Sequence, residues 1–305
     1  MGCGIATAFA MYGYHVSLLD QTKELAQRAS DRIREIVTNL PDDYGEPKRM
    51  PEQIMAALSY EGENNLDTLV PAFSFIIESV FEDPEVKKNL YARINPLLSK
   101  DCIVCSNTSA LNIFEAADLT YPENLMITHW FNPAYVMELI ELIELIRGPK
   151  TSDAAVEAAI SVLMDIGKKP AVINQYIPGF IVNRLGAALM REATYMIQQG
   201  WTSAADIDSA MSLTCGMRYA FEGPVALYDV VGWNIIQAGA KAIYPSLCND
   251  AENGNRLAQE LIEQGNLGIV SGKGVYDYSG VDIPRFMNNR TEKILKMQQF
   301  TRTGL

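Results

Sequence analysis

Short apolar runs alternate with amphipathic stretches over the first 175 residues of the chain. The runs that have the length and character of buried strands are HVSLLD (15–20), FSFIIESV (73–80), CIVCSN (102–107), LMITHWF (125–131), MELIELIELI (137–146) and PAVIN (170–174). Strands that alternate with helices are typical of a parallel sheet with helices packed against it. The pattern therefore predicts an α/β domain.

The segments between these runs have helical periodicity. Helices are predicted from Lys23 to about Leu40, near residues 51–59, over 83–98 and over 151–167. Pro84 falls in the first turn of the third of these helices, where a missing N–H costs little. Ser152 or Thr151 is expected to cap the fourth helix, and Gly167 to end it.

From about residue 178 onward the pattern is helical throughout. The helical segments are LGAALMREATYMIQQG (185–200), SAADIDSAMSLTCG (203–216), VALYDVVGWNIIQAGAKAIY (225–244) and AENGNRLAQELIEQG (251–265). The change in pattern predicts a domain boundary between Gln175 and Pro178. We expect an α/β domain over residues 1–176 and an all-α domain over residues 177–305.

Composition narrows the class of protein and of partner. The chain has 305 residues, 48% of them hydrophobic and 20% charged, with a formal net charge of -12. No stretch has the pattern of a signal peptide or a membrane span, so a cytoplasmic location is expected. The negative charge would repel nucleic acid and anionic membranes, and a small-molecule substrate is the expected partner.

The cysteines do not indicate a disulfide framework. Cys102 and Cys105 form the only close pair among five cysteines, and a C-x-x-C spacing can indicate redox chemistry. Because residues three apart in a strand point to opposite faces, core packing is the favoured interpretation. With only His15 and His129 in the chain, a zinc site of the usual Cys/His type is not indicated.

The opening GCGIATAFAMYGYHVSLLD is similar to part of a dinucleotide-binding unit. Such a unit needs a strand, G-x-G-x-x-G, a helix, and a second strand that ends in an acid for the ribose hydroxyls. Gly2 fits the third glycine and Asp20 fits the acid, while the first strand and the first two glycines are missing. We expect a Rossmann-like domain that lacks its first strand, through a misplaced start site or truncation. Because a carboxylate repels a 2′-phosphate, Asp20 favours NAD over NADP.

Five motifs in order widen the similarity to nearly the whole chain. SNTSALNI, HWFNPAYVMELIE, IPGFIVNR, EGPVALYDVVG and LGIVSGKGVYDY together resemble the L-3-hydroxyacyl-CoA dehydrogenase family, from Gly2 to about Tyr278. The resemblance implies an NAD-dependent oxidoreductase that oxidises a 3-hydroxyl group. It also implies a homodimer formed through the helical domain.

The resemblance assigns His129 as the general base and places an acid twelve residues later, which is Glu141. Imidazole suits the removal of a hydroxyl proton near neutral pH, and a carboxylate orients it. This chain departs from the family here, because ELIELIELI also carries Glu138 and Glu144 and contains a three-residue insertion. Glu144 is the partner instead if the insertion lies earlier, and a solvated charged strand face is the alternative for all three acids.

The remaining site residues also come from the resemblance. Ser109 and Asn183 match residues that bond the substrate oxygen and complete the catalytic site, although Ser and Asn at such positions often serve as caps. Asn132, Glu82 and Lys87 match positions that line the cofactor, and Lys87 could equally be an exposed helix charge.

The substrate is where this chain departs further from the acyl-CoA enzymes. The stretch IVTNLPDDYGEPKR is acidic where those enzymes carry basic residues for CoA. Arg218 lies in GMRYAFEGP, which resembles the lambda-crystallin and gulonate dehydrogenase branch, and it could clamp a free carboxylate or form a structural ion pair. Three hypotheses remain: an L-3-hydroxyacyl-CoA dehydrogenase, a dehydrogenase of a small free hydroxy acid, and a catalytically silent relative with an incomplete NAD site.

Overall fold

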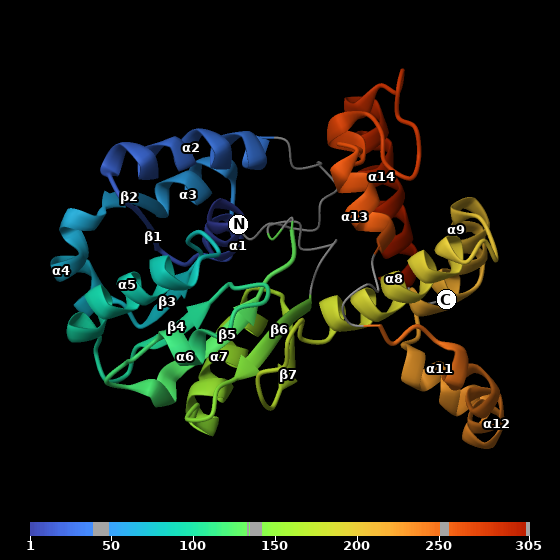
Figure 1. Ribbon diagram of the computed structural model, residues 1–305. Helices are drawn as coiled ribbons and strands as arrows, with labels where there is room; N and C mark the ends of the chain where they lie inside the picture. The colour runs from blue at the N-terminus through green and yellow to red at the C-terminus, as the bar shows by residue number, and fades with distance from the viewer. Residues whose placement is uncertain (39–48, 133, 135–141, 251–255, 303–305) are drawn as a thin grey trace. The chain divides into compact units, whose positions relative to one another are not determined.

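The computed structural model describes residues 1–38, 49–132, 134, 142–250 and 256–302. The chain divides into two compact units, Met1–Ile181 and Val182–Leu305 (Figure 1). Among the described residues, the first unit contains all the strands, and the second is built from helices. The predicted fold class, a Rossmann-like α/β domain followed by an all-α domain, is confirmed.

The strands of the first unit form two groups. These strands are β1 (Val16–Asp20), β2 (Leu58–Gly62), β3 (Phe75–Glu78), β4 (Ile103–Ser106), β5 (Leu125–His129), β6 (Leu142–Arg147) and β7 (Lys169–Ile173). Strands β1 and β2 form a parallel pair, and the other five form one sheet in the order β3-β4-β5-β6-β7. Strand β4 is buried at every position, as expected for an apolar run in the middle of a covered sheet.

Helices cover both faces of these strands (Figure 1). The helices of the first unit are α1 (Gly2–Met11), α2 (Lys23–Thr38), α3 (Pro51–Ala56), α4 (Leu66–Leu69), α5 (Pro84–Ile94), α6 (Ile113–Ala116) and α7 (Asp153–Asp165). Ser152 caps α7 by accepting the N–H of Ala155, which confirms one of the two predicted caps. Asp83 caps α5 ahead of Pro84, by accepting two N–H groups of the first turn.

Two hydrophobic clusters form the core, one on each face of the sheet. The first joins α1, α2, α3 and α7 to β4, β5 and β6, and the second joins α4, α5 and α6 to the opposite face. Cys105 belongs to the first cluster and Cys102 to the second. Both thiols are free and buried, which confirms their predicted role in core packing.

The structure differs from the sequence-based prediction at two strands. Residues 51–59 were expected to be helical, but α3 ends at Ala56 and β2 begins at Leu58. The alternation of Leu58 and Tyr60 with Ser59 is the strand signal there. Strand β6 is antiparallel to β5, although a parallel sheet was expected. The connection between them spans only residues 130–141, and antiparallel neighbours need no helical crossover.

The helices of the second unit are α8 (Val182–Gln198), α9 (Ala204–Leu213), α10 (Cys215–Tyr219), α11 (Pro224–Val231), α12 (Trp233–Ile243), α13 (Arg256–Glu263) and α14 (Ile283–Arg302). Gly232, with φ of 98°, separates α11 from α12 within what the sequence presents as one helical segment. No described helix combines the length and the apolar character that a bilayer crossing requires.

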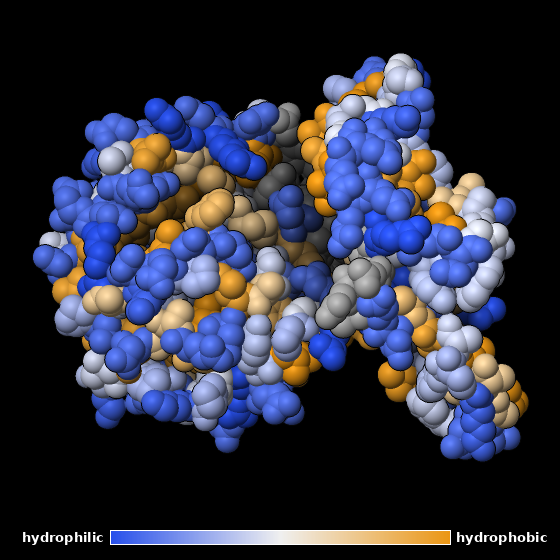
Figure 2. Space-filling view, in the orientation of Figure 1, coloured by the Kyte–Doolittle hydropathy of each residue, from blue (hydrophilic) through white to orange (hydrophobic). Residues whose placement is uncertain are grey.

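The second unit buries little of its apolar surface. Leu227 and Cys248 are the only hydrophobic residues of its described part that are buried. Large apolar side chains are exposed along its helices, among them Leu213, Val230 and Val270, and Figure 2 shows apolar residues distributed over its surface. Exposed apolar surface on this scale indicates an interaction surface.

Candidate active site

The candidate site lies at the carboxyl edge of the parallel strands. Strands β3, β4 and β5 run in the same direction and end at Glu78, Ser106 and His129. Asn107 connects these strand ends, because its side chain accepts the N–H of Trp130 at 3.0 Å and donates to Ser79 Oγ at 3.4 Å. The carboxyl edge is where open α/β sheets bind their ligands.

His129 and Glu144 form a buried pair at this edge. They are directly opposite each other in the antiparallel register of β5 and β6, and His129 Nδ1 lies 2.7 Å from Glu144 Oε2. His129 is 5% exposed and Glu144 is fully buried. Because an ionised carboxylate can only accept a hydrogen bond, the imidazole proton is placed on Nδ1. The lone pair of Nε2 is then available to take a proton.

The partner of His129 differs from the residue that counting favours. Glu141 and Glu138 lie outside the described residues, and the carboxylate that the structure places on His129 is Glu144. Glu144 was the alternative that the sequence left open. The three-residue insertion in ELIELIELI therefore lies before Glu144, the acid that pairs with His129. The register of β5 against β6 places Glu144 directly opposite His129.

Aromatic rings and a backbone amide surround this pair. The ring centroids of Phe131 and Phe180 lie 4.6 Å and 5.3 Å from that of His129. The N–H of Ile181 donates to Glu144 Oε1 at 2.7 Å, so the two carboxylate oxygens have different donors. The pair is held from both sides in an apolar environment, where such hydrogen bonds are strong.

The loop that carries Ser109 is attached to Glu82. Glu82 Oε1 accepts the hydroxyl of Thr108 at 2.5 Å and the backbone N–H groups of Ser109 and Ala110 at 2.9 Å and 3.3 Å. Burial opposes ionisation of Glu82, but the bonds from Thr108 and Ser109, together with Lys87, lower its pKa. The Ser109 side chain itself is exposed, as a substrate contact requires.

Lys87 has a different environment from the one predicted. Its side chain is 1% exposed, so it is neither a solvated helix charge nor open to a ligand. The ammonium lies 2.7 Å from Glu78 Oε1 and 3.2 Å from Glu82 Oε2. Glu78 Oε2 accepts the hydroxyls of Ser106 at 2.6 Å and Tyr91 at 3.1 Å. Burial and the nearby Glu78 raise the pKa of Tyr91, which keeps this phenol protonated as a donor.

Two of the residues expected to hold a dinucleotide, Asp20 and Gly2, lie at the end of β1 and at the start of α1. Asp20 is exposed at the carboxyl end of β1, where its carboxylate is open to ribose hydroxyls. Helix α1 has no side-chain cap, so its first N–H groups are free for phosphate oxygens. Gly2 begins this helix, but a Cβ there would come no closer than 3.9 Å to Ser79.

The other predicted residues lie as follows. Asn132 is exposed just after β5. Asn183 and Arg218 belong to the second unit, in the first turn of α8 and on α10. Arg218 is exposed, and no ion pair joins it to another residue that the structure describes.

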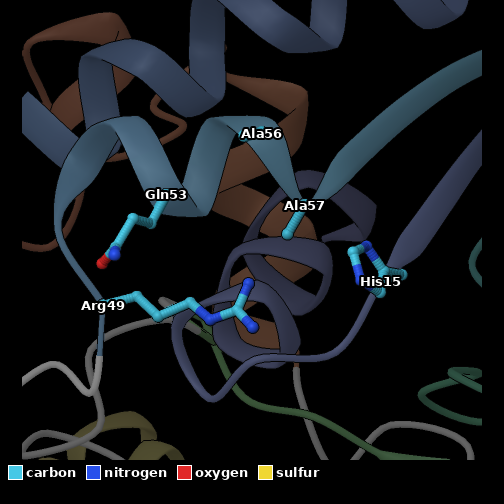
Figure 3. Close-up of a pocket in the computed structure, with 5 residues that line it drawn as sticks. All are labelled: His15, Arg49, Gln53, Ala56 and Ala57. Atoms are coloured by element: carbon cyan, nitrogen blue, oxygen red, sulfur yellow. The ribbon is translucent and has the colours of Figure 1, made fainter.

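A separate pocket lies at the opposite, amino edge of β1 and β2. It is lined by His15, Arg49, Gln53, Ala56 and Ala57 (Figure 3). Arg49 donates to the carbonyl of Gly13 at 3.1 Å, and a Cβ on Gly13 would lie 3.1 Å from the same guanidinium. This pocket is built around that contact and contains none of the predicted site residues.

Sequence reasoning missed several residues of the site. Glu78 and Asn107 end or follow apolar strands, and a polar residue at such a point was an available signal. Phe180 and Ile181 lie far from His129 in the chain, and only the folded structure brings them to the pair.

A Rossmann-like domain with an exposed acid at the end of β1 and a His–Glu pair at the carboxyl edge defines an NAD-dependent dehydrogenase. The comparisons agree with this class. The profile of the 3-hydroxyacyl-CoA dehydrogenase NAD-binding domain matches residues 1–176, and that of its C-terminal domain matches residues 179–278. The chain belongs to the 3-hydroxyacyl-CoA dehydrogenase family, which confirms the resemblance, and its cofactor is NAD.

Individual relatives differ in substrate. The 5-formyl-3-hydroxy-2-methylpyridine 4-carboxylate 5-dehydrogenase of Mesorhizobium japonicum is 29% identical over 98% of this chain and 94% of its own. A crystal structure of an NAD-dependent enzyme with that activity has a TM-score of 0.86 at 27% identity, over 99% of this chain and 95% of its own. The (S)-3-hydroxybutyryl-CoA dehydrogenase of Ralstonia eutropha has a TM-score of 0.72 at 28% identity, over 91% of this chain and 95% of its own.

Proposed function

We propose that this dehydrogenase uses His129 as the general base that removes the proton from a substrate hydroxyl. The observation that carries the proposal is the buried pair with Glu144, which leaves Nε2 as the basic nitrogen. Glu144 stabilises the imidazolium that forms when Nε2 takes the proton. Bound NAD supplies the acceptor for the hydride that leaves the substrate carbon.

The other residues of the site would orient this reaction. Glu82 holds the backbone of Ser109, so that the Ser109 hydroxyl can donate to the substrate oxygen. Asp20 and the first N–H groups of α1 would bind the ribose and the pyrophosphate of the cofactor. Asn183 would provide a second donor to the substrate oxygen, as the family resemblance implies.

We further propose that the substrate is a small free carboxylate that carries the hydroxyl group, or an aldehyde hydrate, to be oxidised. The match to the pyridine carboxylate enzyme covers 99% of this chain, so it includes the 20 residues of α14. Helix α14 lies beyond residue 278, where the family profile ends. Arg218, which forms no ion pair with a described residue, would bind the carboxylate through two hydrogen bonds.

An L-3-hydroxyacyl-CoA is the second candidate substrate. It is favoured by the family profiles and by the similarity to the Ralstonia enzyme. The acidic stretch over residues 36–49 argues against it, because a CoA phosphate needs basic partners.

Substrate profiling distinguishes the two candidates. NADH formation would be followed at 340 nm with 3-hydroxybutyryl-CoA, free 3-hydroxybutyrate and an aromatic ring that carries both a carboxylate and an aldehyde. We expect a higher kcat/KM with a free carboxylate, and a loss of about 2–3 kcal/mol in transition-state binding for Arg218→Met. Turnover of only the CoA ester, with no effect of Arg218→Met, would establish the second candidate.

We also propose that a second copy of the chain covers the apolar surface of the second unit. The support is the scarcity of buried apolar residues there, with Leu227 and Cys248 alone among the described positions. Light scattering on the purified protein tests this. A dimer is expected, and Leu213→Glu, at a side chain 76% exposed, should shift the protein toward the monomer.

A further inference from the structure

The chain turns sharply between β7 and α8, next to the His129–Glu144 pair. The N–H of Phe180 donates to the carbonyl of Ile177 at 3.1 Å, which closes a four-residue turn. Pro178 and Gly179 occupy its central positions, and Gly179 has φ of 78°. Proline followed by a glycine with positive φ is the sequence of a type II turn. The sequence itself therefore encodes the turn.

The residue after this turn has an unusual backbone. Phe180 has φ of 52°, and it is the only described residue other than glycine with a positive φ. It is also fully buried. A bulky side chain disfavours this conformation, so the surrounding contacts must hold it. Strain of this kind persists where the surrounding structure over-determines the backbone, and such places cluster at functional sites.

Both consequences of the turn reach the candidate base. The left-handed backbone at Phe180 sets the position from which the N–H of Ile181 donates to Glu144 Oε1 at 2.7 Å. The Phe180 ring packs 5.3 Å from the imidazole of His129, with an angle of 56° between the two planes. One oxygen of Glu144 is thus occupied by the turn and the other by His129. A rotation of the carboxylate would break both bonds.

We propose that the Gly179–Phe180 turn is the positioning element of the catalytic base. Its backbone fixes the orientation of Glu144, and the Phe180 ring restricts the imidazole to the orientation that bonds Glu144. Neither residue needs to touch the substrate. The expected effect on kcat rests on the proposed function, in which His129 is the base. The effect on the orientation of the His129 imidazole does not depend on that function.

Three variants separate this role from a general effect on folding. Gly179→Ala disfavours the left-handed backbone and substitutes no side chain of the site. Phe180→Leu removes the ring and keeps the buried apolar side chain. Gly200→Ala is the matched control, because Gly200 follows α8 with φ of 68° and no atom lies within 4 Å of an added Cβ. Gly200→Ala introduces the same kind of backbone strain. Gly200 is distant from His129 in the sequence and takes no part in the hydrogen bonds of the His129–Glu144 pair.

The first readout does not depend on activity. In ¹⁵N-labelled protein, the hydrogen-bonded Nδ1 proton of His129 should give a downfield, slowly exchanging NMR signal. The chain has only one other histidine, His15, so loss of the signal in His129→Gln assigns it. We expect this signal to be lost or strongly broadened in Gly179→Ala, to exchange faster in Phe180→Leu, and to be unchanged in Gly200→Ala.

The second readout is kinetic. Gly179→Ala should lower kcat by about a hundredfold while leaving the KM for NAD unchanged. A loss of this size is expected when a catalytic base is displaced slightly from its productive position. An unaltered Nδ1 signal and kcat in both Gly179→Ala and Phe180→Leu would overturn the proposal. If Gly179→Ala does not fold, Phe180→Leu decides. If none of the candidate substrates supports NAD reduction by the wild-type protein, the proposed function fails. The NMR result still tests the positioning in that case.

Discussion

Two buried glutamates at the same edge of the sheet have partners of different chemistry. Glu78, at the end of β3, is 3% exposed and accepts hydrogen bonds from Lys87, Tyr91 and Ser106. Glu144, in β6, is fully buried and bonds His129 and the N–H of Ile181. Both carboxylates are therefore satisfied, and burial alone does not distinguish them.

The difference lies in what each partner can do next. An ammonium has donors only, so Lys87 holds Glu78 and Glu82 in place but cannot accept a proton. An imidazole bonded through Nδ1 still has a second nitrogen that can accept one. The Glu78 cluster therefore maintains the structure of the loop around Glu82 and Ser109, whereas the Glu144 pair can carry out acid–base chemistry.

The largest expected effect is on the imidazole pair. His129→Gln should lower kcat by about 10²–10⁴-fold, the range for loss of a general base, with little change in the melting temperature. The matched control is His15→Gln, because the exposed His15 lies at the opposite edge and should leave kcat unchanged. NADH formation and thermal unfolding measure both quantities. Full activity of His129→Gln would remove the distinction between the two glutamates.

The Glu78 cluster should show the opposite pattern in stability. Glu78→Ala leaves the Lys87 ammonium buried and short of a partner, and a loss of about 3–5 kcal/mol in the free energy of unfolding is expected. Glu63→Ala, which breaks the more exposed pair with Arg93, should cost less than about 1 kcal/mol. Urea unfolding of the two variants makes the comparison. Equal losses in the two variants would show that burial does not determine how much the Glu78–Lys87 pair contributes to the free energy of unfolding.

Glu82 connects the structural cluster to the site, and a smaller effect is expected there. Glu82→Ala removes the acceptor of the Ser109 N–H and should lower kcat by about tenfold through displacement of that loop. Glu85→Ala, at the neighbouring exposed acid of α5, is the control and should leave kcat within twofold. Steady-state kinetics at saturating NAD would measure kcat for both variants. The same kcat in Glu82→Ala and Glu85→Ala would show that Glu82 does not act on catalysis through Ser109.

The two thiols around β4 show burial without a charged partner. Burial raises the pKa of Cys102 from 9.0 to about 11, and it raises the pKa of Cys105 further. At pH 8 both thiols should resist a thiol reagent in native protein and react once it is unfolded. Because the native state holds the Cys102 proton more tightly, the contribution of Cys102 to stability is present below about pH 9 and is lost as the pH rises through 11. Rapid labelling of Cys102 in native protein, found by mass spectrometry, would contradict this.

Much of this protein follows from its sequence alone. The order of the strands and helices other than β2, the Ser152 cap, the burial of Cys102 and Cys105 and the family all follow from local patterns and ordered motifs. These features depend on neighbouring residues or on short spacings, which periodicity records directly.

The tertiary structure decided what depends on contacts between distant residues. It selected Glu144 as the partner of His129, because the acid is determined by the register of β5 against β6 and not by its distance along the chain. It buried Lys87 between two carboxylates, although a lysine on a helix is usually solvated. It also brought Phe180 to the imidazole from 51 positions away in the sequence. Such contacts depend on how strands align and pack. The apolar or polar pattern of one segment does not predict which distant segment will lie against it.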